Sequence, residues 1–443
     1  MIQKKLPLKV FIIYGTGCLG WSISLNMVSV MLNYIYLPPA NSGMKNLIPD
    51  VAWLGFISII SVILFSGRLV DAVVDPLLSN LSDKSKFKLG RRIPFMRFAF
   101  IPLSIFSALM FFPLHRSESY LNIYWLAGMQ LLFYVFYGMY TIPFNALLAD
   151  MGHDAQTQLN LSTAQSVGFI TGIVIASSCT AVVELITKSG LITNKLEAYQ
   201  ISIAVLNGIG MACLAVTAFL LDEKKYVVKA TSKHGVWDAL KITMGNHNFR
   251  IFVLADATYF LSIAIIAAGL LYYLKSMLKL SEALGGAFML ALVIITMAFY
   301  ALVNWLATKF SKKIMMIIAF SVSAVVFSEI FFLGRFPFPP IYQAGLLVLT
   351  FGIPNAFLQI LPNTVVADIA HDAAKKNKDN IEGMFFGIRA FFQKIGQTLG
   401  VTIFAMLITF GKDPGHDMGL RLSGIAGSVF CGIAAIAYTT YRE

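Results

Sequence analysis

Long apolar runs, repeated along the whole chain, limit most strongly how this protein can fold. A helix that crosses about 30 Å of hydrocarbon needs roughly 20 apolar residues, and runs of that length recur from one end of the sequence to the other. Charged residues make up only 13% of the chain, about half the share that is typical of soluble domains, and the mean hydropathy is +0.75. The sequence therefore predicts an all-α integral membrane protein.

Polar residues, proline and glycine divide these runs into twelve predicted spans. The longest polar connection, at 222–249, falls in the middle. We therefore expect an N-terminal six-helix bundle at 1–221, a cytoplasmic central loop at 222–249 and a C-terminal six-helix bundle at 250–443. The predicted spans are 9–37, 51–80, 95–113, 120–149, 160–186, 199–221, 250–277, 282–308, 313–334, 340–369, 384–410 and 418–440.

The distribution of basic residues predicts the orientation of the spans. The net charge is +12, but no soluble basic face is present, so we expect no nucleic-acid partner. About two thirds of the 34 lysines and arginines lie in the even-numbered loops and at the two ends, as the positive-inside rule describes for cytoplasmic segments. We therefore expect a multi-pass protein of the cytoplasmic (inner) membrane with both termini in the cytoplasm.

Cysteine and histidine positions favour neither a metal site nor a disulfide framework. All four cysteines lie inside apolar runs without metal-ligand spacing, and no histidine lies in the middle of a span. The N-terminal residues MIQKKLPLK lead into an apolar stretch too long for a signal-peptide core, so we expect a retained first span. We expect no cofactor apart from a coupling ion. The cysteines are Cys18, Cys179, Cys213 and Cys431.

The second span carries three charges where a membrane helix should have none. Arg68, Asp71 and Asp75 are spaced by three and four residues, which places them on one helical face. Charges at membrane depth are costly and normally face a cavity or a partner. The two carboxylates, one turn apart, suit a monovalent cation with oxygen ligands or a shared proton. The alternative is that Arg68 and Lys394 only neutralise the acids as buried ion pairs.

Three more charged residues in the predicted spans are candidates for a functional role: Asp256, Arg389 and Lys394. The sequence leaves the roles of Asp256 and Arg389 open. The loop SDKSKFKLGRR follows the second span, and its Asp83, Arg91 and Arg92 could clamp neighbouring helix ends when the cytoplasmic side is shut. We predict that these three residues form a cytoplasmic gate.

An internal repeat supports two related halves. The fourth span ends in NALLADMGHDA at 145–155, and the tenth ends in NTVVADIAHDA at 363–373. A duplicated six-helix unit would place the second copy six spans after the first. The loop SDKSKFKLGRR has a degraded counterpart, ATKFSKK, after the eighth span.

These motifs together resemble one family. The pattern R-x-x-D-x-x-x-D-P, followed by S-D-K and G-R-R-x-P-F, is similar to the signature of the glycoside-pentoside-hexuronide:cation symporters, the melibiose permease-like branch of the major facilitator superfamily. The resemblance implies a major facilitator fold of 12 transmembrane helices in two pseudo-symmetric bundles. It also implies that Asp71 and Asp75 bind the cation and that Lys394 links cation to substrate. Further matching segments are YGTGCLGWS, IPFNAL, VADI and EGMFFGIRAFFQKIG.

The chain departs from melibiose permease where that protein holds its sugar. Ser22 and Thr141 replace aspartates, Gln165 replaces an arginine, and Asn145 and Gln359 replace tryptophans. Hydroxyl and amide groups can still bind a polar neutral solute. We therefore predict a substrate site of Trp21, Ser22, Thr141, Asn145, Gln165, Gln359 and Lys394, with Thr141 also a third candidate cation ligand.

The sequence thus predicts a cation-coupled symporter for a small solute, most simply a sugar or glycoside. An amphiphile such as a lysolipid is an alternative, because sodium-dependent lysolipid symporters of vertebrates belong to the same broad family. An uncoupled facilitator or a sensor would not need the buried charges, and a membrane enzyme would carry its motifs in surface loops. Sodium and proton coupling remain open. The expected partners are the lipid bilayer and the substrate, with the protein a monomer.

Overall fold

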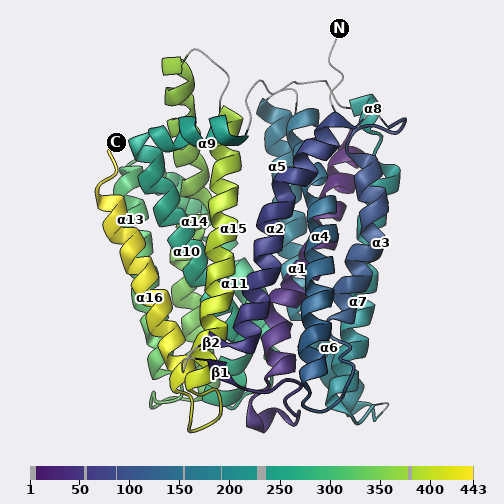
Figure 1. Cartoon of the computed structure of the whole chain (residues 1–443). Helices are drawn as coiled ribbons and strands as arrows, with labels where there is room; N and C mark the ends of the chain where they lie inside the picture. Colours follow the sequence, from purple (N-terminus) through teal and green to yellow (C-terminus); the bar gives the residue numbers. More distant parts are fainter. Residues whose placement is uncertain are drawn as a thin grey trace. The chain divides into compact units, whose positions relative to one another are not determined.

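The computed structural model describes residues 6–53, 57–85, 87–152, 155–190, 192–226, 236–377 and 382–442; some side chains within these ranges, that of Asp83 among them, are outside the description. The chain forms two compact units, and each is a bundle of long helices (Figure 1). Unit 1 comprises Met1–Val51, Val62–Thr231 and Ala283–Gly286. Unit 2 comprises Ala52–Ser61, Ser232–Glu282 and Ala287–Glu443.

The helices of unit 1 follow the first six predicted spans. α2 belongs to this unit from Val62 onwards. A short 3-10 turn, η1 (Ala40–Ser42), follows the first helix, and α8 lies in the predicted central loop. The helices are α1 (Leu8–Tyr36), α2 (Ile59–Lys84), α3 (Ile93–Leu109), α4 (Tyr120–Met151), α5 (Ala155–Ser177), α6 (Cys179–Lys188), α7 (Lys195–Leu220) and α8 (Glu223–Tyr226).

Unit 2 follows the last six predicted spans and adds a small antiparallel strand pair, β1 (Ala52–Trp53) and β2 (Ile57–Ser58). α11 belongs to it from Ala287 onwards. Its helices are α9 (Val236–Gly245), α10 (His247–Tyr272), α11 (Leu284–Ala298), α12 (Tyr300–Ala307), α13 (Lys312–Glu329), α14 (Pro340–Asn377), α15 (Glu382–Leu407) and α16 (Met418–Thr439), with short turns η2 (Tyr273–Met277), η3 (Ile330–Phe332) and η4 (Ile408–Phe410).

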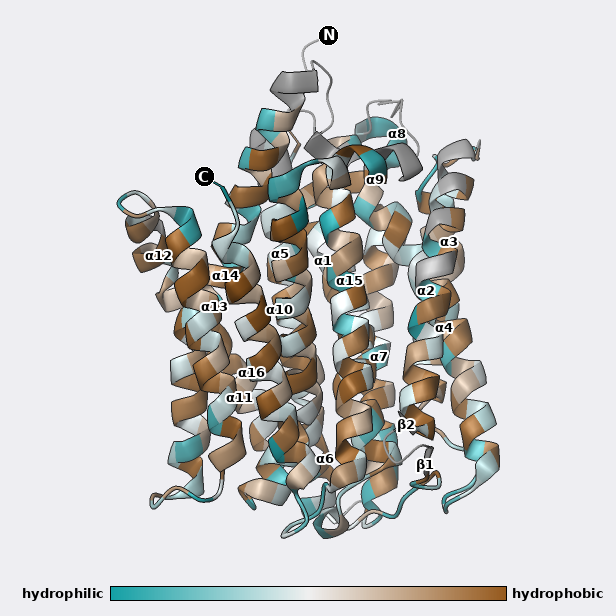
Figure 2. Cartoon of the chain, turned by 60° about the vertical axis from the view of Figure 1, so that its left-hand side comes forward, coloured by the Kyte–Doolittle hydropathy of each residue, from teal (hydrophilic) through white to brown (hydrophobic). Residues whose placement is uncertain are grey.

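Ten helical spans in the described part of the chain are long and apolar enough to cross a membrane. Figure 2 shows apolar residues along them and polar residues gathered near their ends. Two helices that match predicted spans are not among these ten. α2, the second span, carries the charges at Arg68, Asp71 and Asp75, and α3, the third span, has only 17 residues. Lipid offers the backbone no hydrogen bonds, so helices are the expected solution for these runs.

Glycines bring specific helix pairs into close contact. A Cβ at Gly168 of α5 would lie 2.2 Å from the carbonyl oxygen of Gly15 in α1, and one at Gly396 of α15 would lie 2.2 Å from that of Ala257 in α10. Only glycine permits such an approach, which is a common basis of helix packing in membranes. These contacts fix the α1–α5 pair of unit 1 and the α10–α15 pair of unit 2, and both pairs carry candidate site residues.

Side-chain caps mark several helix starts. Ser119 Oγ accepts a hydrogen bond from the Leu121 N–H, and the Asn194, Asn246 and Ser311 side chains accept bonds in the first turns of α7, α10 and α13. A cap satisfies an N–H group that has no partner within its own helix. The helix starts at the membrane surface are therefore defined locally by short polar residues.

The structure departs most from the predicted helices in the second, fifth and eighth spans. The second span is predicted to be helical from 51, but the strand pair occupies part of 52–58 and α2 begins at Ile59. The fifth and eighth spans are each interrupted, at Ser178 and Phe299. An apolar run predicts burial in lipid, but without a periodic pattern it does not locate a short strand or a helix break.

Candidate functional site

The charged face predicted on α2 lies inside unit 1. Arg68 is 9% exposed and Asp71 is 3% exposed, while Asp75 is half-buried. The Arg68 guanidinium interacts electrostatically with both carboxylates. The structure therefore brings these three side chains together, as their spacing of three and four residues predicts.

Two tyrosines of α4 complete this cluster. The Arg68 guanidinium carbon lies 5.0 Å from the centre of the Tyr134 ring, within the range of a cation–π interaction. Tyr137 interacts electrostatically with Arg68 and with both acids. Both tyrosines lie in an apolar run, so the sequence did not mark them as functional residues. Their spacing of three residues was the available signal, since it places both on the α4 face that also carries Thr141.

α4 passes close to the second acid. A Cβ at Gly138 would lie 3.2 Å from Asp75 Oδ1. Thr141, one turn further along, is buried, and its hydroxyl donates a hydrogen bond of 2.9 Å to the Tyr137 carbonyl. The lone pairs of that hydroxyl oxygen can still bind a cation. A cation-binding role for Thr141 stays a prediction.

Trp21 of α1 sits in an aromatic cluster. Its ring centre lies 6.1 Å from that of Tyr137 and 5.3 Å from that of Phe169. The indole Nε1 is buried and makes no hydrogen bond to the described residues. An indole N–H can only donate. A substrate contact for Trp21 stays a prediction.

Ser22, next to Trp21, is fully buried, and its side chain points towards α5. Its hydroxyl donates a hydrogen bond of 2.7 Å to the Phe169 carbonyl, which links α1 to α5. In this arrangement Ser22 joins two helices, and its predicted contact with substrate needs the hydroxyl to exchange partners.

A polar, uncharged surface lies on α4 and α5. Gln165 Nε2 donates a hydrogen bond of 2.9 Å to Asn145 Oδ1, and the Asn145 side chain is exposed within the described structure. Ser162 and Ser166 of α5 are exposed too. Side chains that form hydrogen bonds suit water or a polar solute better than lipid. Two predicted substrate residues, Asn145 and Gln165, are therefore in direct contact on such a surface.

Two predicted residues belong to unit 2. Gln359 is exposed on α14, and Lys394 is half-buried on α15. Asp71 and Asp75 belong to unit 1. The predicted link between Lys394 and these acids stays a prediction.

A second buried ion pair, whose role the sequence left open, joins three helices of unit 2. Arg389 of α15 binds Asp256 of α10 through Nε–Oδ2 at 2.8 Å and Nη2–Oδ1 at 3.3 Å. Gln393 donates to Asp256 Oδ2 at 2.8 Å, and Arg389 Nη1 donates to Asn363 Oδ1 of α14 at 2.5 Å. Asp256 is 1% exposed, so both members of the pair are withdrawn from solvent and rely on these partners.

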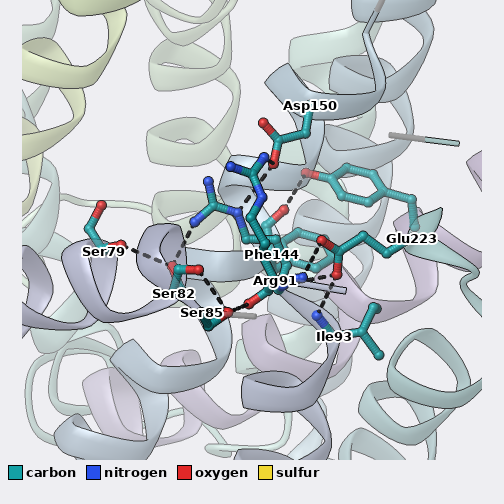
Figure 3. A network of polar contacts seen from close by, with 10 residues as sticks. Ser79, Ser82, Ser85, Arg91, Ile93, Phe144, Asp150 and Glu223 are labelled. Carbon is teal, nitrogen blue, oxygen red and sulfur yellow. Dashed lines mark hydrogen bonds and ion pairs between the residues drawn. The ribbon is translucent and has the colours of Figure 1, made fainter. Parts of the chain in front are cut away.

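The predicted gate arginines join helix ends within unit 1 (Figure 3). Arg92 Nε contacts Asp150 Oδ2 at the end of α4, at 3.2 Å, and its Nη1 donates to Ser82 Oγ near the end of α2, at 2.6 Å. Arg91 Nη2 lies 3.6 Å from Asp150 Oδ2. Burial raises the pKa of Asp150 above its ordinary value, against the opposing charge of Arg92. Asp83, the third predicted gate residue, lies outside the described side chains.

The side chain of Glu223, at the start of α8, binds the backbone of the loop that carries Arg91 and Arg92. Its carboxylate accepts hydrogen bonds from the N–H groups of Arg91, Arg92 and Ile93, at 2.7, 2.8 and 3.0 Å. A carboxylate at a helix N-terminus satisfies unpaired N–H groups and is favoured by the helix dipole. Gly90 has φ +119°, and a Cβ there would meet Glu223 at 2.2 Å, which explains the glycine of the GRR motif.

The internal repeat gives related contacts in the two units. Asp150, in the first copy, binds Arg92, which lies just before α3. Asp368, in the second copy, binds Lys312 at the start of α13 at 2.6 Å. In each unit an acid near the end of one long helix therefore meets a base at the start of another.

Comparisons with known proteins agree on the family. The model of the MFS/sugar transport protein family matches residues 13–417. A sodium-dependent lysophosphatidylcholine symporter from Xenopus tropicalis is 23% identical over 383 residues, covering 78% of this chain and 71% of that protein. An isoprimeverose transporter from Lactiplantibacillus pentosus is 20% identical over 400 residues, covering 90% of this chain and 79% of that protein.

Solved structures show the same fold. The xylose transporter from E. coli has a TM-score of 0.67 at 13% identity, covering 98% of this chain and 96% of that one. A nucleoside transporter has a TM-score of 0.68 at 13% identity, covering 98% and 99%. The predicted major facilitator fold and the resemblance to the glycoside–cation symporters are confirmed. The chain belongs to the MFS/sugar transport protein family of the major facilitator superfamily, and it is a membrane transporter and not an enzyme.

Proposed function

We propose that the protein is a cation-coupled symporter that moves a small, polar, uncharged solute, with a sugar or glycoside as the first candidate. The observation that carries this proposal is the cluster of the buried Arg68 and Asp71 with the half-buried Asp75. The two carboxylates lie one helical turn apart beside one guanidinium. Together they can supply oxygen ligands for a sodium ion, or they can share a proton.

Coupling follows if the cation and the solute stabilise the same state of the transporter. Such a coupling free energy is reciprocal and is commonly about 1–3 kcal/mol. Trp21, Asn145 and Gln165 supply donors and acceptors without charge, which suits hydroxyl groups. We further propose that Lys394 of unit 2 responds to the charge of the cation site. Both termini are proposed to be cytoplasmic. The protein is proposed to work as a monomer.

A lysolipid is the second candidate substrate. It is favoured by similarity to a sodium-dependent lysophosphatidylcholine symporter, and by the aromatic rings of Tyr137, Phe144 and Phe169 around Trp21. Rings of this kind can stack on a sugar or line the path of an acyl chain, so the aromatic cluster suits both candidates.

A thermal-shift screen distinguishes the candidates. Purified protein is heated with sugars, glycosides, nucleosides or lysolipids, each in sodium, lithium or potassium at several pH values. Stabilisation by one substrate class that grows with sodium identifies a sodium symporter for that class, and a shift that depends only on pH identifies proton coupling. Flux in proteoliposomes without any response to a sodium or proton gradient would instead indicate an uncoupled facilitator.

Asp75→Asn and Asp71→Asn test the cation site. Each variant should lose cation-driven accumulation in proteoliposomes while remaining folded in the membrane. Asp222→Asn removes an exposed carboxylate between α7 and α8 and serves as the control with unchanged uptake. Gradient-driven uptake at the wild-type rate in both cluster variants would remove the proposed site.

A further inference from the structure

Unit 2 contains an apolar groove that is separate from every residue proposed for cation or substrate. It has a volume of about 330 Å³ and lies between α12, α13 and α14. Its lining is entirely hydrophobic, and Pro354 interrupts the N–H pattern of α14 beside it. A groove of this chemistry suits a hydrocarbon chain better than a polar solute.

The groove opens away from the interior of unit 2. Among its lining residues, Phe310 is 57% exposed, Ile318 is 55% exposed and Ile353 is 37% exposed, whereas Met315 and Ala319 at the bottom are buried. Along α13 the lining runs from 314 to 322, which is about 12 Å of helix. The lining side chains of α13 therefore follow the axis of that helix.

One end of the groove is basic. Lys309, Lys312 and Lys313 lie where α12 is joined to α13 and where α13 begins, on both sides of the lining residue Phe310. Asp368 pairs with Lys312 at 2.6 Å. The N-terminal end of a helix dipole is positive, so two lysines in the first turn are unfavourable there and an anion is favourable. The arrangement suits a negatively charged group.

Trp305 marks the same end as the level of lipid headgroups. Trp305 is 53% exposed, and Lys309 Nζ lies 4.0 Å from the centre of its ring. Exposed tryptophans gather where hydrocarbon meets water, and lysine extends from there to the headgroups. The basic end therefore lies at the interface, and the groove runs from it towards the hydrocarbon.

We propose that this groove binds one acyl chain of an anionic phospholipid, whose phosphate is held by Lys309, Lys312 and Lys313. Basic pockets between transmembrane helices are typical binding sites for anionic headgroups. The acyl chain supplies the apolar contacts, and the phosphate oxygens accept hydrogen bonds from the lysine ammonium groups. The site serves a structural lipid of the bilayer and not the transported solute.

Native mass spectrometry tests the headgroup. Full-length protein in detergent is mixed with equal amounts of phosphatidylglycerol and phosphatidylcholine of identical chains, and the lipid that remains bound is counted. The wild type should retain phosphatidylglycerol in preference. In a Lys309→Gln, Lys312→Gln, Lys313→Gln variant this preference should fall by about fivefold for each lysine that contacts the phosphate. Lys241→Gln, at an exposed position of α9, should leave it unchanged.

A second variant tests the groove and guards against misfolding of the first. Val322→Phe places a larger ring at an exposed lining position and should reduce retention of both lipids without changing the preference between them. Phosphatidylglycerol with bromine on its chain should quench the fluorescence of Trp305. The contribution of Trp305 is the difference in fluorescence between the wild type and Trp305→Phe. Val322→Phe should weaken the quenching of this contribution. No preference for phosphatidylglycerol in the wild type, or unchanged retention of both lipids in Val322→Phe, would overturn the proposal.

Discussion

At the scale of single residues, the buried charges of this transporter form two separate groups. Arg68 accompanies two acids in unit 1, whereas Arg389 accompanies one acid, Asp256, in unit 2. The second group is a balanced, bidentate pair, which is suited to holding helices in register. The first group presents two carboxylates one turn apart, which are suited to binding a cation through their oxygens.

Removing one member of the balanced pair should destabilise the protein. Asp256→Asn leaves the Arg389 charge buried without its carboxylate, and we expect a loss of about 3–5 kcal/mol in the free energy of unfolding. The double variant Asp256→Leu, Arg389→Met should lose much less, because no charge is then left unpaired. Denaturant unfolding of purified protein in detergent measures both.

The exposed ion pair of α6 provides the control. Lys188 and Glu184 have side chains that are 73% and 31% exposed, so Glu184→Gln should change stability by less than about 1 kcal/mol. Equal losses for Asp256→Asn and for the double variant would contradict the account of a buried unpaired charge.

The pKa of Asp150 predicts a dependence of stability on pH. Burial raises this pKa in the folded state, so the folded protein takes up the proton before the unfolded chain does. This group therefore adds stability as the pH falls through its raised pKa, and the gain is complete below the ordinary aspartate pKa. Asp150→Asn lacks this contribution. The free energy of unfolding of the wild type should therefore increase relative to that of the variant as the solution becomes acidic. Paired melting curves from neutral to acidic pH measure it, and a shift in the opposite direction would show that Arg92 outweighs burial.

At the scale of helices, close contact at glycine holds each unit together. Gly168→Ala should lower stability by about 1–3 kcal/mol, because its Cβ would overlap the Gly15 carbonyl and force α1 and α5 apart. A methyl group at Gly208 of α7 would meet no atom of the described structure within 4 Å. Gly208→Ala should therefore be neutral or slightly stabilising, because alanine is the better helix former. Melting curves of the two variants make the comparison, and equal effects would show that the α1–α5 contact is not limiting.

The helices also show what the sequence can and cannot predict. Run length and the spacing of Arg68, Asp71 and Asp75 are sufficient for the membrane helices and for the charged face of α2, because both are local properties. The roles of Tyr134 and Tyr137 depend on how α4 packs against α2, and the Arg389–Asp256 pair depends on α15 meeting α10. Neither contact has a local signal, so sequence spacing alone could not assign partners.

At the scale of the whole molecule, the orientation of the chain in the membrane stays a prediction from the distribution of basic residues. Single cysteines at Lys88, between α2 and α3, and at Arg335, between α13 and α14, test it. Both positions are exposed. In a background without the four native cysteines, an impermeant maleimide added outside intact cells should label the cysteine at 335 and leave the one at 88 unmodified until the membrane is opened. The reverse pattern would place the termini outside.

The contact made by Glu223 also has a consequence for the order in which the protein is assembled. The N–H groups at the start of α3 receive their carboxylate from a residue 130 positions later than Ile93. At usual rates of translation that interval is on the order of ten seconds. The loop that carries Arg91 and Arg92 therefore leaves the ribosome long before its last partner exists, and it can be completed only when α7 has been synthesised and inserted.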